Sequence, residues 1–174
     1  VIEADVDRLI EKLLDAGIQA FFLLGTMGEG PLLPDEQKKN LIKRAVKTVN
    51  GRAKIIVNSS ETSTNRIISI GKMAEDLGCD MLASTLPIYL PMENQQAICD
   101  FYSEVASTAN VPFIIYDIPK LVNSKIFISS LSQLSKEENI IGIKDSSGDF
   151  HRFRELLYVF RQRNDFSLFT GDEW

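Results

Sequence analysis

The chain alternates between short apolar runs and longer segments in which apolar residues recur at helical spacing. Each apolar run is bounded by glycine or polar residues and is typical of a buried strand. The six runs are Gln19–Leu24, Lys54–Val57, Asp80–Ala83, Phe113–Tyr116, Ile140–Ile143 and Phe166–Phe169. Between them, apolar residues three or four positions apart predict amphipathic helices. Strands that alternate with helices predict a parallel sheet with right-handed crossovers, so we expect an α/β fold.

Two arrangements of such a sheet remain open, an open doubly wound sheet and a (β/α) barrel. Four of the strands are followed by glycine or polar clusters, at Gly25–Glu29, Tyr116–Asp117, Lys144–Asp145 and Gly171–Asp172. A barrel gathers the carboxyl ends of all its strands around one site, whereas an open sheet uses mainly the ends at its switch point. The four clusters therefore favour a barrel.

The composition is that of an ordinary globular domain, with 44% hydrophobic and 25% charged residues among 174. The net charge of −5 and the lack of a basic run argue against nucleic-acid binding. No apolar stretch is long enough to span a bilayer. Cys79 and Cys99 are expected to be buried thiols, so we expect a cytoplasmic protein without disulfides. A single histidine, His151, gives little support to a metal site.

Lys144 closes the apolar run Ile140–Ile143 and is followed at once by Asp145. The end of a parallel strand is where α/β proteins place their ligands. Burial of an ammonium group favours the neutral amine, which attacks carbonyl carbons, so one hypothesis is a lysine that forms a Schiff base. The other is a lysine that extends to solvent or pairs with Asp145.

The glycine-rich segment Gly25–Gly28 lacks the lysine of a P-loop and the spacing of a dinucleotide-binding fingerprint. It is either a simple strand-to-helix turn or a set of backbone amides that binds an anion such as a carboxylate. Tyr116, taken alone, is more typical of a packed or hydrogen-bonded residue at a strand end than of a catalytic group.

Taken together, these segments resemble the motifs of the dihydrodipicolinate synthase/N-acetylneuraminate lyase family. Gly25–Glu29 is similar to the GTTGE motif of that family, and Tyr116–Pro119 is similar to its Y-N-x-P motif. Gly142–Lys144 resembles the G-[IL]-K motif that carries the Schiff-base lysine. The stretch Pro87–Tyr89 resembles P-Y-Y, and Gly171–Glu173 resembles the strand-end G-x-[DE]. The motifs occur in the family's order, and the resemblance covers essentially the whole chain.

The resemblance implies a (β/α)8 TIM barrel, here truncated to about six strand–helix units that correspond to the second to seventh strands. Residues 1–174 would then form one partial barrel domain that lacks the first strand, the eighth strand and the C-terminal helices. It also implies a class I aldolase or lyase that handles pyruvate and an aldehyde or 2-keto acid. Such an enzyme needs no cofactor or metal, because its substrate is bound covalently on Lys144. The family forms homo-oligomers, so we expect a tetramer.

The resemblance also implies a role for each motif residue. Lys144 attacks the C2 carbonyl of the substrate and Tyr116 transfers protons. Thr26, together with the backbone amides of Met27 and Gly28, holds the pyruvate carboxylate. In the family a second tyrosine, expected here at Tyr89, is linked to the catalytic tyrosine through a threonine. This chain has Met27 in place of that threonine, and methionine has no hydroxyl group to form the link.

Two further features bear on the substrate. Dihydrodipicolinate synthases carry an arginine two residues after the proline of Y-N-x-P, where this chain has Leu121. Asp172 and Glu173 resemble the acidic pair with which neuraminate lyases contact sugar hydroxyls. We therefore expect a sugar-derived 2-keto acid, such as a 2-keto-3-deoxy sugar acid or a sialic acid. The alternatives are a 4-hydroxy-tetrahydrodipicolinate synthase and a barrel-like binding protein without turnover.

Overall fold

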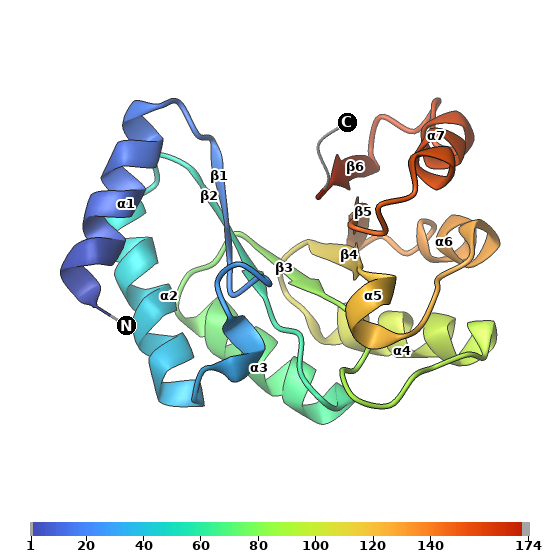
Figure 1. The fold of residues 1–174 in the computed structure, drawn as a ribbon, viewed down its shortest axis with the longest axis horizontal. Helices are drawn as coiled ribbons and strands as arrows, with labels where there is room; N and C mark the ends of the chain where they lie inside the picture. Colours follow the sequence, from blue (N-terminus) through green and yellow to red (C-terminus); the bar gives the residue numbers. More distant parts are fainter. Residues whose placement is uncertain (1, 172–174) are drawn as a thin grey trace.

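The computed structural model describes residues 2–171. Its elements, in chain order, are α1 (Glu3–Asp15), β1 (Ala20–Leu23), η1 (Gly30–Leu32), α2 (Asp35–Val49), β2 (Lys54–Asn58), α3 (Thr64–Asp76), β3 (Met81–Ser84), α4 (Gln95–Thr108), β4 (Phe113–Asp117), α5 (Pro119–Val122), α6 (Ile128–Leu134), β5 (Ile140–Asp145), α7 (Phe150–Val159) and β6 (Ser167–Thr170). Strands and helices alternate along the chain, as the hydrophobic pattern predicts (Figure 1).

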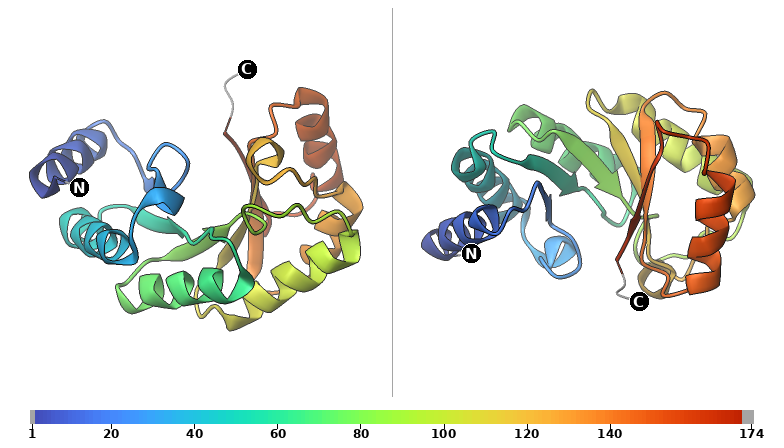
Figure 2. Two further views of the ribbon diagram at one scale, coloured as in Figure 1. Left: turned by 60° about the horizontal axis from the view of Figure 1, so that its bottom comes forward. Right: turned by 90° about the horizontal axis from the view of Figure 1, so that it is seen from above.

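The six strands form one parallel sheet in the order β1-β2-β3-β4-β5-β6. Every strand pairs only with the strands that precede and follow it in the sequence, and within the described residues β1 and β6 are the two edges. The sheet curls, and the long helices cover its outer side (Figure 2). The architecture is therefore a curled part of a (β/α) barrel, which confirms the predicted fold class and rules out the doubly wound alternative.

The curl separates two apolar layers. The larger layer lies between the sheet and the helices, where α2 contributes Ile42, Ala45 and Val49, all essentially inaccessible to solvent. The smaller layer consists of Ile56, Ala83 and Ile114, one from each of three neighbouring strands. Successive side chains of a strand point to opposite faces of the sheet. Both faces of the central strands are thus apolar, which explains why the sequence shows continuous apolar runs and no alternation.

The structure differs from the pattern expected from the sequence mainly in the segments that follow the strands. Helix α4 begins at Gln95 because the side chain of Asn94 accepts a hydrogen bond from the Ala97 amide, at 3.0 Å, and caps the helix. The short segments η1 and α5 were not expected, because each follows a turn and is too short to show a period. Both Cys79 and Cys99 are buried free thiols, as predicted. No helix within residues 2–171 is long and apolar enough to cross a membrane.

Candidate active site

Lys144 and Tyr116 lie side by side at the carboxyl ends of neighbouring strands. The register of β4 and β5 pairs Tyr116 with Lys144, so both side chains leave the same face of the sheet. The Nζ atom of Lys144 lies 4.0 Å from the centroid of the Tyr116 ring. The ring of Phe22, on β1, meets the Tyr116 ring edge to face at 5.5 Å. Sheet register therefore brings together a lysine and a tyrosine that are 28 positions apart in the sequence.

Lys144 does not pair with Asp145. Its Nζ atom donates a hydrogen bond to the Oγ atom of Ser146, at 2.9 Å, and the side chain is partly and not fully buried. Asp145 is buried on the opposite face of the sheet, where it accepts a hydrogen bond from Arg152. The second hypothesis for Lys144 allowed either a side chain that extends to solvent or an ion pair with Asp145, and the ion pair is wrong. Ser146 was not predicted, although its position two residues after Lys144 places it on the same face of an extended chain.

Gly171, at the end of β6, leaves space for the lysine. A Cβ atom at this position would lie 2.0 Å from the Oγ atom of Ser146 and 3.0 Å from Nζ of Lys144. Any side chain here would displace the hydrogen-bonded pair. The lack of a side chain at Gly171, the glycine of the predicted strand-end motif, thus leaves room for the Lys144 side chain.

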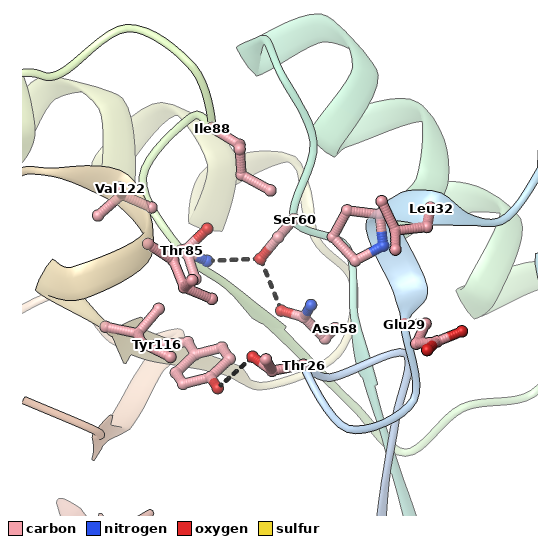
Figure 3. Close-up of a pocket in the computed structure, with 12 residues that line it drawn as sticks. Thr26, Glu29, Leu32, Asn58, Ser60, Thr85, Ile88, Tyr116 and Val122 are labelled. Atoms are coloured by element: carbon pink, nitrogen blue, oxygen red, sulfur yellow. Dashed lines mark hydrogen bonds between the residues drawn. The ribbon is translucent and has the colours of Figure 1, made fainter.

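The hydroxyl group of Tyr116 has one hydrogen-bond partner among the described residues. Its Oη atom lies 3.2 Å from Oγ1 of Thr26, which follows β1 on the far side of the curled sheet (Figure 3). Either atom can be the donor. The predicted catalytic tyrosine and the predicted carboxylate-binding threonine therefore belong to one hydroxyl pair.

The glycine-rich turn is held by its own backbone. The Gly28 amide donates to the Gly25 carbonyl at 3.1 Å, and the Glu29 amide donates to the Thr26 carbonyl at 3.1 Å. Of the three groups predicted to bind a carboxylate, the Gly28 amide is thus already used within the turn, whereas the Met27 amide and the Thr26 hydroxyl remain as candidates. Met27 is 98% exposed and lies at the rim of the cavity that contains Lys144.

Two adjoining cavities meet at Tyr116. The first, of about 490 Å³, contains Lys144 and Ser146 together with the glycine turn, and it also includes Lys120 and Leu121. The second, of about 280 Å³, lies toward β2 and β3, between η1 and α5 (Figure 3). Thr26, Tyr116, Ile118 and Leu121 line both cavities. The two cavities are therefore contiguous beside the Tyr116 side chain.

A buried charge cluster lies behind the site, between the sheet and α7. Arg152 donates to Asp117 at 2.5 Å and to Asp145 at 2.9 Å, and all three side chains are buried. Burial raises the pKa of Asp117 to about 6, although the positive charge of Arg152 opposes that change. The Oδ1 atom of Asp117 has no hydrogen-bond partner among the described residues. Arg152 thus ties together the two strands that present Tyr116 and Lys144.

Among the described residues, the predicted second tyrosine, Tyr89, is not gathered at the site. Tyr89 is 85% exposed, has a positive φ of 102° and lines neither cavity among the described residues. A positive φ is strained for an aromatic residue. Asp172 and Glu173 lie outside the described residues. Within residues 2–171 no group of histidine, cysteine and acidic side chains is arranged to hold a metal ion.

Comparison with known proteins agrees with this geometry. The model of the dihydrodipicolinate synthetase family matches residues 1–174. The 4-hydroxy-tetrahydrodipicolinate synthase of Alkaliphilus oremlandii is 29% identical over 170 residues, which are 98% of this chain and 58% of that protein. The synthase of Staphylococcus epidermidis is 30% identical over 177 residues and is covered to 58%. The chain therefore spans about 58% of the length of these relatives.

Solved structures show the same relationship. The crystal structure of dihydrodipicolinate synthase from Aquifex aeolicus superposes with a TM-score of 0.89 at 30% identity, covering 98% of this chain and 57% of that one. The Acinetobacter baumannii dihydrodipicolinate synthase complexed with pyruvate has a TM-score of 0.92 at 28% identity, covering 99% and 58%. The family model matches every residue of the chain, and the curled parallel sheet and the paired lysine and tyrosine agree with that match. The chain belongs to the dihydrodipicolinate synthetase family.

Proposed function

We propose that this chain carries the Schiff-base site of a class I aldolase or lyase that joins pyruvate to an aldehyde or releases pyruvate from a 2-keto acid. The observation that carries the proposal is the position of the Lys144 amine, 4.0 Å from the Tyr116 ring, in a cavity that also contains the Thr26–Tyr116 hydroxyl pair. An amine beside a proton-transferring hydroxyl is the pair of groups that imine formation requires.

The chemistry follows from these two side chains. The neutral amine of Lys144 attacks C2 of pyruvate, and the resulting carbinolamine loses water to give an iminium ion. Loss of a proton from C3 gives an enamine, whose C3 then attacks the carbonyl carbon of the aldehyde. Water finally hydrolyses the iminium and restores the lysine. The iminium is itself the electron sink, so the sequence of steps needs no cofactor.

Tyr116 is placed to move the protons. An unperturbed phenol titrates near ~10, so it works near neutral pH only when a partner orients it and shares its proton. Thr26, 3.2 Å away, is such a partner. The Thr26 side chain and the Met27 amide are the groups that would hold the carboxylate of pyruvate, in keeping with the pyruvate-bound Acinetobacter baumannii relative.

Two classes of aldehyde partner have specific support. Similarity to 4-hydroxy-tetrahydrodipicolinate synthases favours aspartate semialdehyde, the aldehyde partner of those enzymes. The chain itself opposes this, because Leu121 stands where the synthases carry an arginine, and Lys120 cannot form the same bidentate pair with a carboxylate. A sugar-derived partner is favoured by Leu121 and by the sequence of Asp172 and Glu173. The homotetramer implied by the family stays a prediction.

The test is reductive trapping on the native protein. Incubation with pyruvate followed by borohydride should attach a stable adduct to Lys144, and peptide mass mapping should locate it there. Lys144→Ala should abolish the label. The matched control is Lys120→Ala, because Lys120 lines the same cavity but does not contact Tyr116 or Ser146 in the described structure. A label that survives Lys144→Ala, or that is lost only in Lys120→Ala, would contradict the assignment.

A further inference from the structure

We propose that the second cavity, beside Tyr116, is the subsite for the aldehyde partner and that it selects an uncharged aldehyde with an apolar chain or ring. This inference rests on the proposed function, since it assumes that an enamine forms at Lys144. It differs from both partner classes named above, which are an anionic aldehyde and a polyhydroxylated one.

The position of the cavity qualifies it for this role. It adjoins the cavity of Lys144, and the two share Thr26, Tyr116, Ile118 and Leu121. The hydroxyl group of Tyr116 stands at the boundary, where it can reach the oxygen atom of an aldehyde whose carbonyl carbon faces the enamine. The rest of the aldehyde then extends toward β2 and β3 (Figure 3). The volume of the second cavity, about 280 Å³, suits an aldehyde with a short chain or a single ring.

The walls of this cavity are apolar. They are formed by Pro31, Leu32, Ile88, Ile118, Leu121 and Val122. Leu32 and Leu121, on the facing segments η1 and α5, keep 79% and 51% of their surface exposed. An apolar substituent that covered them would remove this surface from water, which favours binding.

The polar groups of the floor are already paired with one another. The Asn58 side chain donates to the Leu24 carbonyl at 2.9 Å and accepts from the Ser60 hydroxyl at 2.7 Å. The Ser60 hydroxyl in turn accepts from the Thr85 amide at 2.8 Å, as Figure 3 shows. The Thr85 hydroxyl donates to the Leu86 carbonyl, also at 2.8 Å. Sugar hydroxyls placed here would give up bonds to water and would have to compete with bonds that already exist.

The charges around the cavity disfavour an anion. Among the described lining residues there is no lysine or arginine, and the one charged side chain is Glu29 at the edge. Its carboxylate makes no hydrogen bond or ion pair within residues 2–171, so no protein cation offsets the repulsion between it and an anionic substrate. Lys38 and Arg66 both bind Glu61, the residue after Ser60, and are not available to a substrate. A carboxylate in this cavity would therefore be desolvated without a partner, which is costly.

The experiment compares three aldehydes of similar size with pyruvate in the native protein. Butanal is apolar, glyceraldehyde is hydroxylated and succinate semialdehyde is anionic. We expect kcat/KM for butanal to exceed that for each of the others by about tenfold or more, the scale of one well-matched apolar contact. Higher kcat/KM with glyceraldehyde or succinate semialdehyde would overturn the proposal, and so would failure to turn over any of the three while pyruvate is still trapped.

Two variants test the walls. Leu121→Arg adds a cation beside Tyr116 and should reverse the order of butanal and succinate semialdehyde, whereas the isosteric control Leu121→Met should keep it. Leu32→Ala changes an exposed side chain, so folding is preserved, and it should raise KM for butanal several-fold. In Leu32→Ala, whose side chain lines only the second cavity, pyruvate trapping at Lys144 should keep its rate. In Leu121→Arg the trapped adduct should still form on Lys144. If native trapping fails, the proposed function falls first; if trapping is intact and neither Leu121→Arg nor Leu32→Ala changes aldehyde preference, only the subsite is wrong.

Discussion

The Nζ atom of Lys144 lies over the ring of Tyr116, 4.0 Å from its centroid. A positive charge over an aromatic face is attracted by the ring, whereas proton transfer requires the hydroxyl group at its edge. The ring face and the hydroxyl group of Tyr116 therefore act on different partners, the first on Lys144 and the second on Thr26. Substitutions can separate these two contributions.

Tyr116→Phe keeps the ring over Lys144 and removes only the hydroxyl group. We expect kcat to fall by roughly 10²-fold or more, the scale of positioned acid–base catalysis, with little change in KM. Steady-state kinetics measure both. Thr26→Val, which removes the partner hydroxyl but keeps the shape, should lower kcat less. A rise in KM at unchanged kcat in Tyr116→Phe would mean that the hydroxyl binds substrate and does not transfer protons.

Arg152→Met should strongly destabilise the protein. The substitution leaves the buried carboxylates of Asp117 and Asp145 without their shared cation, and breaking such a pair typically costs about 3–5 kcal/mol. Urea unfolding measures the difference. Arg152→Lys is the matched control, because it keeps the charge but cannot contact both carboxylates as a planar fork. Its free energy of unfolding should therefore lie between those of the native protein and Arg152→Met. An unchanged free energy of unfolding in Arg152→Met would show that the cluster adds no stability.

Asp117 should make stability depend on pH in an unusual direction. Its pKa is raised from 3.8 to about 6 in the folded state, so between these values the folded protein binds more protons at this residue than the unfolded chain. Its contribution to the free energy of unfolding therefore falls as pH rises through this window and stays constant above it.

Asp117→Asn cannot ionise and provides the comparison. The free energy of unfolding of Asp117→Asn minus that of the native protein should increase between about pH 4 and pH 6, and level off above. Carboxylates such as Asp7, whose pKa is lowered to about 2 by its bond to Arg44, make stability rise with pH. Because both proteins contain them, the subtraction removes their contribution. A difference that does not vary between pH 4 and pH 6 would contradict the raised pKa.

Gly30→Ala should destabilise the turn after β1, whereas Gly28→Ala should not. A Cβ atom at Gly30 would lie 2.1 Å from the backbone carbonyl oxygen of Leu24, which cannot move aside, whereas at Gly28 the nearest atom is at an ordinary 3.5 Å. We expect Gly30→Ala to lower the free energy of unfolding by at least about 2 kcal/mol and Gly28→Ala by less than about 1. Urea unfolding of both variants checks the difference, and equal losses would mean that the turn relaxes around the added methyl group.

Much of the fold could be predicted because its signals are local. The apolar residues of helix α2 recur at helical spacing up to its last residue, Val49, and each apolar run became a strand. The side-by-side position of Tyr116 and Lys144 could only be expected from the family motifs, since the register of β4 and β5 includes a shift between Phe113 and Ile114 that no local pattern reveals.

Other parts of the site could not be read from the sequence for physical reasons. The pairing of Arg152 with Asp117 and Asp145 depends on how α7 packs on the sheet, and an arginine in a helix is usually exposed. The pairing of Asn58, Ser60 and Thr85 depends on loops after two different strands. Polar residues in loops give no sign of whether their hydrogen bonds are used within the protein or left for a substrate.

The strand order also determines how the molecule can assemble. Each strand of the sheet pairs only with its neighbours in the sequence, so the sheet can grow one strand and one helix at a time as the chain is synthesised. At each stage the newest strand is an exposed apolar edge until the next one arrives, and such edges recruit other chains. A delay between the emergence of β4 and that of β5 would leave Phe113–Asp117, a strand of five buried residues, as that exposed edge.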